Sequence, residues 1–318
     1  MSALHVERLG FGPDVVMLHG WALHGGMWGP WLDSLAEHAR LHVVDLPGHG
    51  HSAWRNEITD VAGLARSVFP SIPRGATVLG WSLGGMVALE LARRHPQHIG
   101  SLVLIATTPR FVAGDGWEHG MRSDVLDGFA RGLADDYRAT VRNFLALQAL
   151  GDENAAQALR TLRSKLATHG EPDPRALAAG LAILRNVDLC DDLPRIATPT
   201  LVIVGERDRL TPPEAGRELA MRLPSARFHV IERAGHAPFL SHPDEVLREV
   251  VPFLKKPSPA TAGEGTSGDA AAATRGVRVA EKPSPALCAT SPAGGRGTEP
   301  SPGLRPTSPA GGRGEDAT

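Results

Sequence analysis

Short apolar runs alternate with helical patterns over the first 254 residues of this 318-residue chain, and this alternation constrains its fold most. Each run is hydrophobic almost throughout, which is typical of parallel strands covered on both faces of a sheet. The runs predict strands at Val15–Leu18, Leu41–Val44, Ala76–Leu79, Leu102–Ile105, Leu201–Val204 and Arg227–Ile231. Helices are expected between them, for example at Met86–Arg94 and Glu214–Arg222. We therefore expect an α/β fold with a mostly parallel, doubly wound sheet and right-handed crossovers.

The alternation stops between Arg110 and Asp188. That stretch holds no convincing strand, and its Leu-, Ala- and Arg-rich patterns predict helices over residues 125–133, 136–150, 155–168 and 175–184. An all-helical insertion in an α/β sheet would lie over the strand ends. We expect residues 110–188 to form a helical lid, and residues 1–109 and 189–254 to form the core.

The composition changes again at Lys255. Residues 255–318 contain 11 Gly, 9 Pro and 12 Ala and no aromatic residue, and the octet Thr290–Gly297 recurs without change as Thr307–Gly314. So little apolar surface cannot offset a backbone ordering cost of about 1–2 kcal/mol per residue. This part is expected to be a disordered low-complexity tail. It could be dispensable or serve as a tether.

Composition and charge exclude several classes of protein. The net charge of −2, from 33 basic and 35 acidic residues, lacks the excess of positive charge that is typical of nucleic-acid-binding proteins. No apolar run approaches the ~18 residues of a membrane span, and charges at Glu7, Arg8 and Asp14 do not fit a secretory signal peptide. The only cysteines, Cys190 and Cys288, are too far apart in the sequence to suggest a disulfide framework or a zinc cage. A cytoplasmic protein is expected.

A nucleophile motif lies at Gly80–Gly84, whose sequence Gly-Trp-Ser-Leu-Gly matches G-x-S-x-G. A predicted strand precedes it and a predicted helix follows, as a nucleophile elbow requires. The turn is so tight that the residues flanking the serine must be small. The motif predicts that Ser82 is the nucleophile of a serine hydrolase, with its hydroxyl exposed near the positive end of the next helix.

A serine hydroxyl needs a base, and in this fold the acid and the base follow the nucleophile in the order Ser, Asp or Glu, His. Asp208 follows the strand at Leu201–Val204, and His236 follows the strand at Arg227–Ile231. Glu206 lies two positions from Asp208 and is the competing acid. The order predicts a triad of Ser82, Asp208 and His236, in which the carboxylate orients the imidazole and stabilises its cationic form.

The tetrahedral oxyanion needs two backbone N–H donors, each worth about 3–4 kcal/mol. We expect one donor to be the backbone N–H of Leu83, the residue after the nucleophile. The other is expected to be the N–H of Trp21, in the loop after the first core strand. The Trp21 indole could wall an acyl pocket or simply pack. His19, His49 and His51 lie in nearby loops, where we expect structural roles such as backbone hydrogen bonding.

The same residues also carry a family resemblance. Trp21, Gly80–Gly85, Phe144–Gln148, Val187–Leu189 and Gly235–His242 together resemble the pimeloyl-[acyl-carrier protein] methyl ester esterase family, the BioH family of biotin synthesis. The resemblance covers residues 1–254, including the lid, where α/β-hydrolases differ most, and excludes the tail. It implies the α/β-hydrolase fold and a monomeric, cytoplasmic serine esterase without metal or cofactor. Such an enzyme hydrolyses the methyl ester of the pimeloyl chain on acyl-carrier protein and releases methanol.

The resemblance implies which residues of this chain correspond to the family's functional residues. The triad falls on Ser82, Asp208 and His236, and the oxyanion and substrate contacts fall on Trp21 and Leu83. The acyl-chain contacts fall on Phe144, Leu145, Ala146, Leu147 and Gln148. Val141, Phe144, Leu145 and Gln148 share one helical face, which suits an apolar wall or ordinary core.

Basic residues of the lid suggest a dock for the acidic carrier protein, whose prosthetic arm bears a phosphate. They are Arg138, Arg142, Arg160 and Arg163, with Lys165 close by. A solvated helix face is the alternative, because the chain is rich in Arg.

Three rival functions stay open. One is a broad carboxylesterase acting on small free esters without a carrier protein, and another is a cofactor-free perhydrolase that shares the triad. The third is a non-catalytic binding module, which a missing triad residue would favour; none is missing. Relatives that use an Asp nucleophile are excluded by Ser82.

Overall fold

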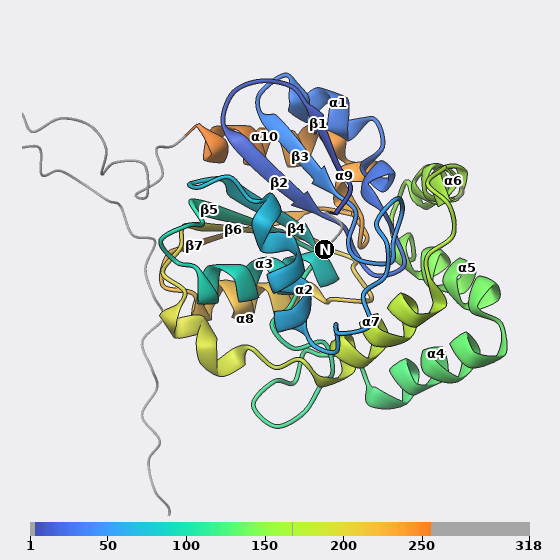
Figure 1. Ribbon diagram of the computed structural model, residues 1–318. Helices are drawn as coiled ribbons and strands as arrows, with labels where there is room; N and C mark the ends of the chain where they lie inside the picture. Colours follow the sequence, from blue (N-terminus) through green and yellow to red (C-terminus); the bar gives the residue numbers. More distant parts are fainter. Residues whose placement is uncertain (1–3, 167, 256–318) are drawn as a thin grey trace, which may run out of the picture. The chain divides into compact units, whose positions relative to one another are not determined.

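The computed structural model describes residues 4–166 and 168–255, and the predicted tail from residue 256 onward lies outside this range. The described chain contains a seven-stranded sheet in the order β1-β3-β2-β4-β5-β6-β7 (Figure 1). All pairings are parallel except that of β1 with β3. The strands are β1 (Val6–Leu9), β2 (Asp14–Leu18), β3 (Arg40–Val44), β4 (Thr77–Trp81), β5 (Ser101–Ile105), β6 (Thr200–Gly205) and β7 (Ala226–Ile231).

Successive strand side chains enter two different apolar cores, one on each face of the sheet. In β2, for example, Val16 and Leu18 belong to one core, and Val15 and Met17 to the other. The first core is covered by α2 (Val61–Val68), α3 (Leu83–Arg94) and α8 (Pro213–Arg222), and the second by α1 (Trp31–Ala36) and α10 (Pro243–Leu254) (Figure 1). Helices on both faces explain the continuous hydrophobicity of the central strands. The predicted doubly wound α/β fold is confirmed.

The strand order changes direction at β2 and β4, because β3 lies on one side of β2 and β4 on the other. Leu18 at the end of β2 pairs in register with Gly80 near the end of β4. The loops that follow these two strands are therefore neighbours at the carboxyl edge of the sheet. In open α/β sheets, ligands bind in the crevice at such a switch point.

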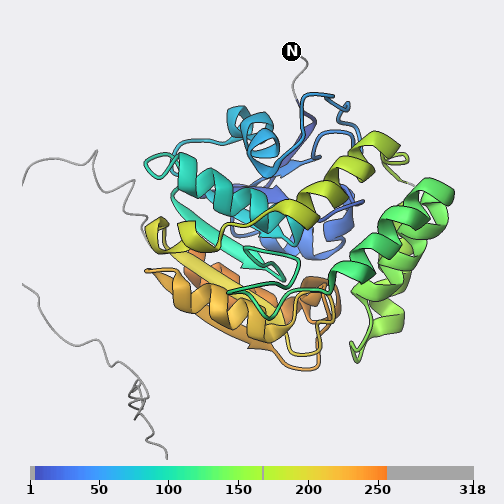
Figure 2. The ribbon, with the colours of Figure 1, turned by 90° about the horizontal axis from the view of Figure 1, so that it is seen from below.

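Residues 110–188, which we call the lid segment, connect β5 to the short helix η3 (Cys190–Arg195) before β6. Its described part contains α4 (Ser123–Asp135), α5 (Tyr137–Gln148), α6 (Ala155–Leu166) and α7 (Pro174–Asn186). Figure 2 shows these green to yellow-green helices grouped together at one side of the sheet. Residues 111–122 are not helical and form two isolated bridges, Val112 with Met121 and Gly114 with Trp117. The segment is thus mostly, not entirely, helical.

Local capping explains where several lid helices begin. The Asp136 carboxylate accepts a hydrogen bond from the Ala139 N–H at 2.9 Å, which caps α5. The Asp173 carboxylate caps α7 in the same way, and Pro174 occupies the first helical position, where no N–H is needed. Within the described residues, no helix combines the length and apolarity needed to cross a membrane.

Candidate active site

Ser82 occupies the tight turn between β4 and α3. Its φ of 55° lies in the left-handed region, an uncommon conformation for a residue with a side chain. The Ser82 N–H donates to the Ile105 carbonyl at 3.0 Å, and the Thr107 hydroxyl donates to the Ser82 carbonyl at 2.6 Å. The turn is therefore fixed from the neighbouring strand β5, and the serine stands at the end of the sheet with its strain held by the surrounding structure.

Close contacts with neighbouring backbone atoms explain why the motif has glycine at positions 80 and 84. A Cβ on Gly80 would lie 2.4 Å from the Gly84 carbonyl oxygen, and one on Gly84 would lie 2.1 Å from the Leu18 carbonyl oxygen. Both distances are far inside van der Waals contact. The sequence predicts small residues at these positions. Their size lets the first turn of α3 pack directly on the end of β2.

Asp208 and His236 form a buried pair on the adjacent strand ends. His236 Nδ1 donates to Asp208 Oδ2 at 2.8 Å, and both side chains are fully buried. Asp208 Oδ1 also accepts the N–H groups of Leu210 and Thr211, at 2.8 and 3.0 Å. Glu206 instead accepts the Arg233 N–H from an exposed position. The structure thus pairs Asp208, not Glu206, with the histidine.

Trp81 connects the nucleophile turn to the histidine loop. Its indole N–H donates to the His236 carbonyl at 2.9 Å, so Ser82, the next residue, lies beside that loop. His236 Nε2 is buried and has no hydrogen-bond partner among the described residues. Because Nδ1 carries the proton shared with Asp208, the free Nε2 has the lone pair that a general base needs.

The loop after β2 lies against the nucleophile on its other side. A Cβ on Gly20 would be 3.3 Å from the Ser82 Cβ, so the main chain of this loop passes next to the serine. Ala22, with a φ of 62°, turns the chain immediately after Trp21. The backbone N–H groups of Trp21 and Leu83 have no hydrogen-bond partner within the described chain. Two free donors beside Ser82 match the expected oxyanion hole.

The Trp21 side chain is buried and packed between lid helices. Its indole N–H donates to the Leu177 carbonyl of α7 at 2.9 Å, and its ring packs edge-on against Phe144 of α5 with centroids 4.8 Å apart. A Cβ on Gly180 would lie 2.5 Å from this indole. The tryptophan therefore joins the loop after β2 to two lid helices, α5 and α7.

The predicted helical face of α5 is buried, but the full predicted contact segment is not. Phe144, Leu145 and Gln148 are buried, and Gln148 Oε1 has no hydrogen-bond partner among the described residues. Ala146 is exposed and Leu147 is half-buried. Helical periodicity turns Ala146 away from the buried face of α5, and its predicted contact with the acyl chain stays a prediction.

Two side chains at the site were not predicted from the sequence. The Thr211 hydroxyl donates to Asp208 Oδ2 at 2.7 Å and lies 3.3 Å from His236 Nδ1. Asp152, in the lid loop between α5 and α6, accepts the Gly235 N–H at 2.7 Å. The spacing of Thr211 three residues after the acid is a weak signal that could have identified it. No local signal marks Asp152, because its partner is distant in sequence.

Other buried histidines nearby have structural roles. His19 Nε2 accepts the Leu46 N–H at 2.9 Å and its Nδ1 bonds the Gly20 carbonyl, which confirms the expected backbone role. Burial lowers the pKa of His19 to about 3 and that of His49 to about 4. Both imidazoles are therefore neutral at pH 7. His49 Nδ1 bonds the Pro47 carbonyl at 3.0 Å within its own turn.

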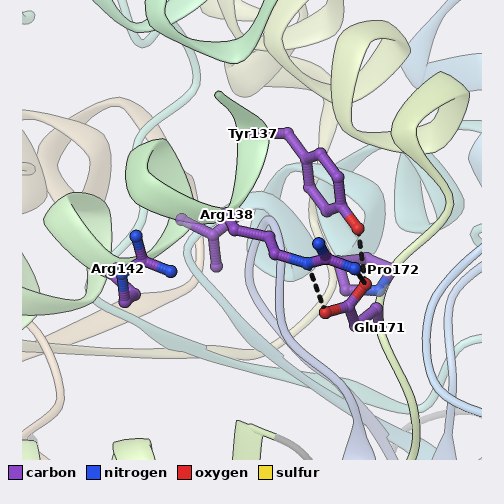
Figure 3. A pocket seen from close by; sticks show the side chains of 6 residues that line it. Tyr137, Arg138, Arg142, Glu171 and Pro172 are labelled. Atoms are coloured by element: carbon purple, nitrogen blue, oxygen red, sulfur yellow. Dashed lines mark hydrogen bonds and ion pairs between the residues drawn. The ribbon is translucent and has the colours of Figure 1, made fainter. Parts of the chain in front are cut away.

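The lid arginines predicted to bind a carrier protein are exposed on α5 and α6. Figure 3 shows Arg138 and Arg142 beside a pocket of about 130 Å³ that Tyr137, Glu171 and Pro172 help to line. Arg138 is not free, because its guanidinium donates two hydrogen bonds to Glu171, at 2.7 and 2.8 Å. These bonds lower the pKa of Glu171 to about 2, so its carboxylate is charged at neutral pH.

The remaining arginines of this group are less constrained. Arg160 donates to Gln157 at 2.7 Å on the same helix. Neither Arg142 nor Arg163 makes a hydrogen bond or ion pair with the described part of the chain. The exposed charges available to a partner are thus those of Arg142 and Arg163, whereas Arg138 would first have to leave Glu171.

The fold and the site together define a serine hydrolase of the α/β-hydrolase class. A sequence model of the alpha/beta hydrolase family matches residues 15–249. An esterase structure from Exiguobacterium antarcticum is similar, with a TM-score of 0.71 and 26% identity over 80% of this chain and 96% of that one. A bromoperoxidase structure from Bacillus anthracis shares the fold, with a TM-score of 0.73 and 21% identity, over 80% of this chain and 95% of the other.

Closer relatives narrow the class. The pimeloyl-[acyl-carrier protein] methyl ester esterase of Stenotrophomonas maltophilia (strain K279a) is 43% identical over 261 residues, which cover 82% of this chain and 100% of the relative. The protein of the same name from Aeromonas hydrophila is 42% identical over 253 residues, 79% of this chain and 99% of the relative. The chain belongs to the pimeloyl-[acyl-carrier protein] methyl ester esterase family, the BioH family of α/β-hydrolases, and is a carboxylic ester hydrolase.

Proposed function

We propose that this protein hydrolyses the methyl ester of pimeloyl-[acyl-carrier protein] to the free carboxylate and methanol, as a step of biotin synthesis. The observation that carries the proposal is the buried Asp208–His236 pair beside the elbow serine, in a chain that matches relatives of that name over nearly their whole length. The residue roles follow from the geometry of the site.

In the first half of the reaction, Ser82 Oγ attacks the ester carbonyl while His236 Nε2 takes its proton. The negative charge moves to the carbonyl oxygen, where the N–H groups of Leu83 and Trp21 stabilise it. Asp208 keeps the imidazolium oriented through Nδ1. Collapse of the intermediate breaks the bond to the methoxy oxygen, which receives the proton from Nε2 and leaves as methanol.

In the second half, water attacks the acyl-enzyme. His236 Nε2 takes a proton from the water, the same two N–H groups stabilise the second oxyanion, and Ser82 Oγ leaves with the proton returned from Nε2. The products are the free serine and a carboxylic acid. The buried wall formed by Phe144 and Leu145 suits the methylene chain, and the unpaired Gln148 Oε1 provides a polar acceptor along it.

The partner we propose is the acidic carrier protein, bound over the exposed arginines of α5 and α6. Arg142 and Arg163 supply unpaired positive charge, and exposed charges of this kind mainly accelerate encounter. Arg138 joins them when Glu171 is displaced by the partner's own anionic groups. Arg160, one turn from Arg163 on α6, adds to the same charge.

We further propose that the enzyme acts as a monomer in the cytoplasm. The large apolar side chains exposed in the described chain, Phe11, Val125, Leu150 and Met221, are scattered over different elements. Singly exposed apolar residues are normal on monomeric proteins, whereas a stable interface needs a contiguous patch. The division into a core of residues 1–109 and 189–254 and a lid of 110–188 is part of the same proposal.

A carboxylesterase that acts on small free esters without a carrier is the second candidate. The observation that favours it is the ion pair of Arg138 with Glu171, because a docking residue already paired within the lid attracts a partner less strongly. In that case the lid would bind only the acyl group.

One experiment separates the two candidates. Reversing both Arg138 and Arg142 to Glu replaces attraction of an acidic partner with repulsion. If the carrier proposal holds, kcat/KM for the carrier-bound methyl ester falls about ten-fold or more, and hydrolysis of a small p-nitrophenyl ester is nearly unchanged. Added salt should also slow the parental reaction with the carrier substrate, because the Debye length is about 8–10 Å.

The ratio of the two rates is the decisive quantity. Equal losses on both substrates would mean that the substitutions damage the lid itself. No loss on either substrate would contradict carrier docking and favour the small-ester carboxylesterase.

A further inference from the structure

Four histidines form a row of ring contacts at the boundary between the core and the lid, beside one buried carboxylate, and none of them belongs to the triad. His24 and His169 stack with ring centroids 4.3 Å apart, His51 and His169 stack at 4.7 Å, and His5 meets His51 edge-on at 4.8 Å. Asp45 lies among them after β3. His169 comes from the lid loop between α6 and α7, whereas the other residues come from the core.

Among the described residues, the carboxylate of Asp45 has no Lys or Arg partner, and its one ion-pair contact is with His169 at 3.8 Å. Its side chain is 1% exposed, and its oxygens accept the backbone N–H groups of Gly25 and His51, at 2.7 and 2.9 Å. Both donors are neutral. A buried carboxylate is costly unless it is paired with a positive charge or coordinates a metal ion. The surroundings of Asp45 therefore favour a cation.

His169 points an unused nitrogen at this carboxylate. Its Nδ1 is buried without a hydrogen-bond partner in the described chain, and it lies 3.8 Å from Asp45 Oδ2. Buried polar atoms almost always have a partner, so an unpaired one needs an explanation such as a missing ion. Gly26 makes the approach of the ring possible, because a Cβ there would lie 3.0 Å from His169 Nε2.

His24 already has the outer support that metal ligands commonly have. One ring nitrogen, Nε2, bonds the Lys165 carbonyl at 3.0 Å, and the other, Nδ1, accepts the Gly26 N–H at 3.1 Å. A histidine that binds a metal through one nitrogen usually donates the other N–H to a carbonyl or carboxylate. Nδ1 would then exchange the Gly26 N–H for the ion while the bond to Lys165 stays in place.

We infer that His24, Asp45 and His169 form a binding site for a divalent transition-metal ion, Zn²⁺ in particular, that bridges the lid to the core. One ligand atom from each residue lies within 4.8 Å of the others. Tetrahedral Zn²⁺ with bonds of about 2.0–2.2 Å needs ligand atoms about 3.3–3.6 Å apart, so rotation of the three side chains would have to bring them closer by about 1 Å. Two imidazoles and one carboxylate favour Zn²⁺ over Mg²⁺ or Ca²⁺.

Such an ion would act on stability rather than on the ester bond. It would attach the α6–α7 loop to the loops that follow β2 and β3. Its ligand His24 lies only three residues beyond Trp21. An ion that binds the folded chain and not the unfolded one raises the melting temperature as its free concentration rises. Esterase turnover needs no metal in the proposed mechanism, so a failure of this site leaves that mechanism untouched.

The test uses the full-length protein freed of metal and titrated with ZnCl₂, with MgCl₂ as the comparison. Calorimetry should show one Zn²⁺ per chain, and the melting temperature should rise with Zn²⁺ but not with Mg²⁺. His169→Ala should weaken Zn²⁺ binding at least about ten-fold, since even residues that support a ligand contribute that much. The matched control is His229→Ala, because His229 forms a half-exposed pair with Glu249 at 3.7 Å and should not affect binding.

A second measurement needs no variant. Diethylpyrocarbonate should modify His169 in the metal-free parent protein, and Zn²⁺ should protect it, as mass spectrometry of the digested chain can show. The proposal is overturned if no saturable Zn²⁺ binding occurs or if His169→Ala binds as tightly as the parent. Equal modification of His169 with and without Zn²⁺ would overturn it as well. This measurement uses the parent protein, so it holds even if His169→Ala fails to fold.

Discussion

The backbone N–H of His236 donates to the carbonyl oxygen of Gln148 at 3.1 Å, so the loop that carries the proposed base is held by the last turn of a lid helix. Asp152 adds a second bond from the lid to the same loop, at the Gly235 N–H. The lid segment therefore also fixes the position of the loop that carries the His236 imidazole, the proposed base. Damage to the lid is expected to reduce kcat as well as substrate binding.

Replacing Asp152 tests this coupling. Asp152→Ala removes the acceptor of both the Gly235 and the Asn154 N–H groups, so the histidine loop should lose part of its support. We expect kcat for a small p-nitrophenyl ester to fall about ten-fold with little change in KM, because a misplaced catalytic group mainly affects the chemical step. Steady-state kinetics would show this, and an unchanged kcat would contradict the coupling. Asp135→Ala, an exposed aspartate at the end of α4, is the control.

Thr211 is expected to be a positioning residue for the acid and the base. Thr211→Val keeps the shape of the side chain but removes the hydroxyl that donates to Asp208 Oδ2. A buried carboxylate that loses one hydrogen bond is oriented less firmly, and one such bond to a charged group is worth about 1.5–3 kcal/mol. The pH profile of kcat/KM should shift while KM stays nearly constant. Thr211→Ser should retain the parental profile, and a profile unchanged in Thr211→Val would exclude the role.

Ser82→Ala tests the nucleophile. The variant should fold normally, yet turnover should fall by about 10⁴-fold or more, since loss of a triad nucleophile removes nearly all of the cooperative catalysis. A serine-directed phosphonate should add its mass to the peptide that contains Ser82 in the parent protein only. Full activity in the variant, or labelling of another serine, would disprove the mechanism.

Glu171 should control how readily Arg138 meets an acidic partner. Glu171→Gln removes the carboxylate that pairs with this guanidinium, so the positive charge becomes available at the surface. We expect kcat/KM for the carrier-bound ester to rise about two- to five-fold at low salt, because exposed charges act mainly on encounter. The p-nitrophenyl ester rate should not change. Glu57→Gln removes the same charge from an exposed core loop, and an equal rise there would show a net-charge effect only.

Acid sensitivity should depend partly on Glu90 of α3, whose side chain is 1% exposed. Burial alone would raise its pKa, but hydrogen bonds from Arg93 and Arg94 outweigh burial and lower the pKa below the ordinary value of 4.5. A lowered pKa in the folded state means that the stabilisation is present above the unfolded value and disappears as the pH falls through the folded value.

The variant Glu90→Gln measures this contribution. It should lose about 1–3 kcal/mol of unfolding free energy at pH 7, because charged hydrogen bonds to a buried group are removed. Its deficit relative to the parent should shrink as the pH falls below the ordinary value of 4.5 and through the lowered pKa of Glu90 in the folded parent. Urea unfolding at both pH values provides the comparison, and a deficit that is constant with pH would rule out the ion pairs as its cause.

The sequence predicts the central strands and the elbow well because their signals are local. Continuous apolar runs mark buried parallel strands, and Gly80 and Gly84 flank Ser82 at the spacing that the turn requires. The edge strand β1 gave no such signal, because its residues 6–9 are only partly buried or exposed and its pairing with β3 is antiparallel. Asp152 was missed for a related reason, since its partner lies 83 positions away in the chain.

The inclusion of Ala146 among the predicted substrate contacts has a different cause. The resemblance supplied Phe144–Gln148 as one continuous segment, whereas a helix presents only every third or fourth residue to the same side. Periodicity alone selects Val141, Phe144, Leu145 and Gln148, and all of these are buried. The residue pattern therefore identifies the buried face of α5, whereas the contiguous segment also includes the exposed Ala146.

The double attachment of Trp21 has a consequence for how substrate enters. Its indole N–H is bonded to α7 and its ring is packed edge-on against Phe144 of α5, so both helices hold one side chain of the loop after β2. Withdrawal of either helix alone would disturb this tryptophan and, through it, the main chain that we propose stabilises the transition state. An ester that enters by displacing either helix should therefore also disturb the proposed oxyanion donor, so that substrate entry and turnover are coupled.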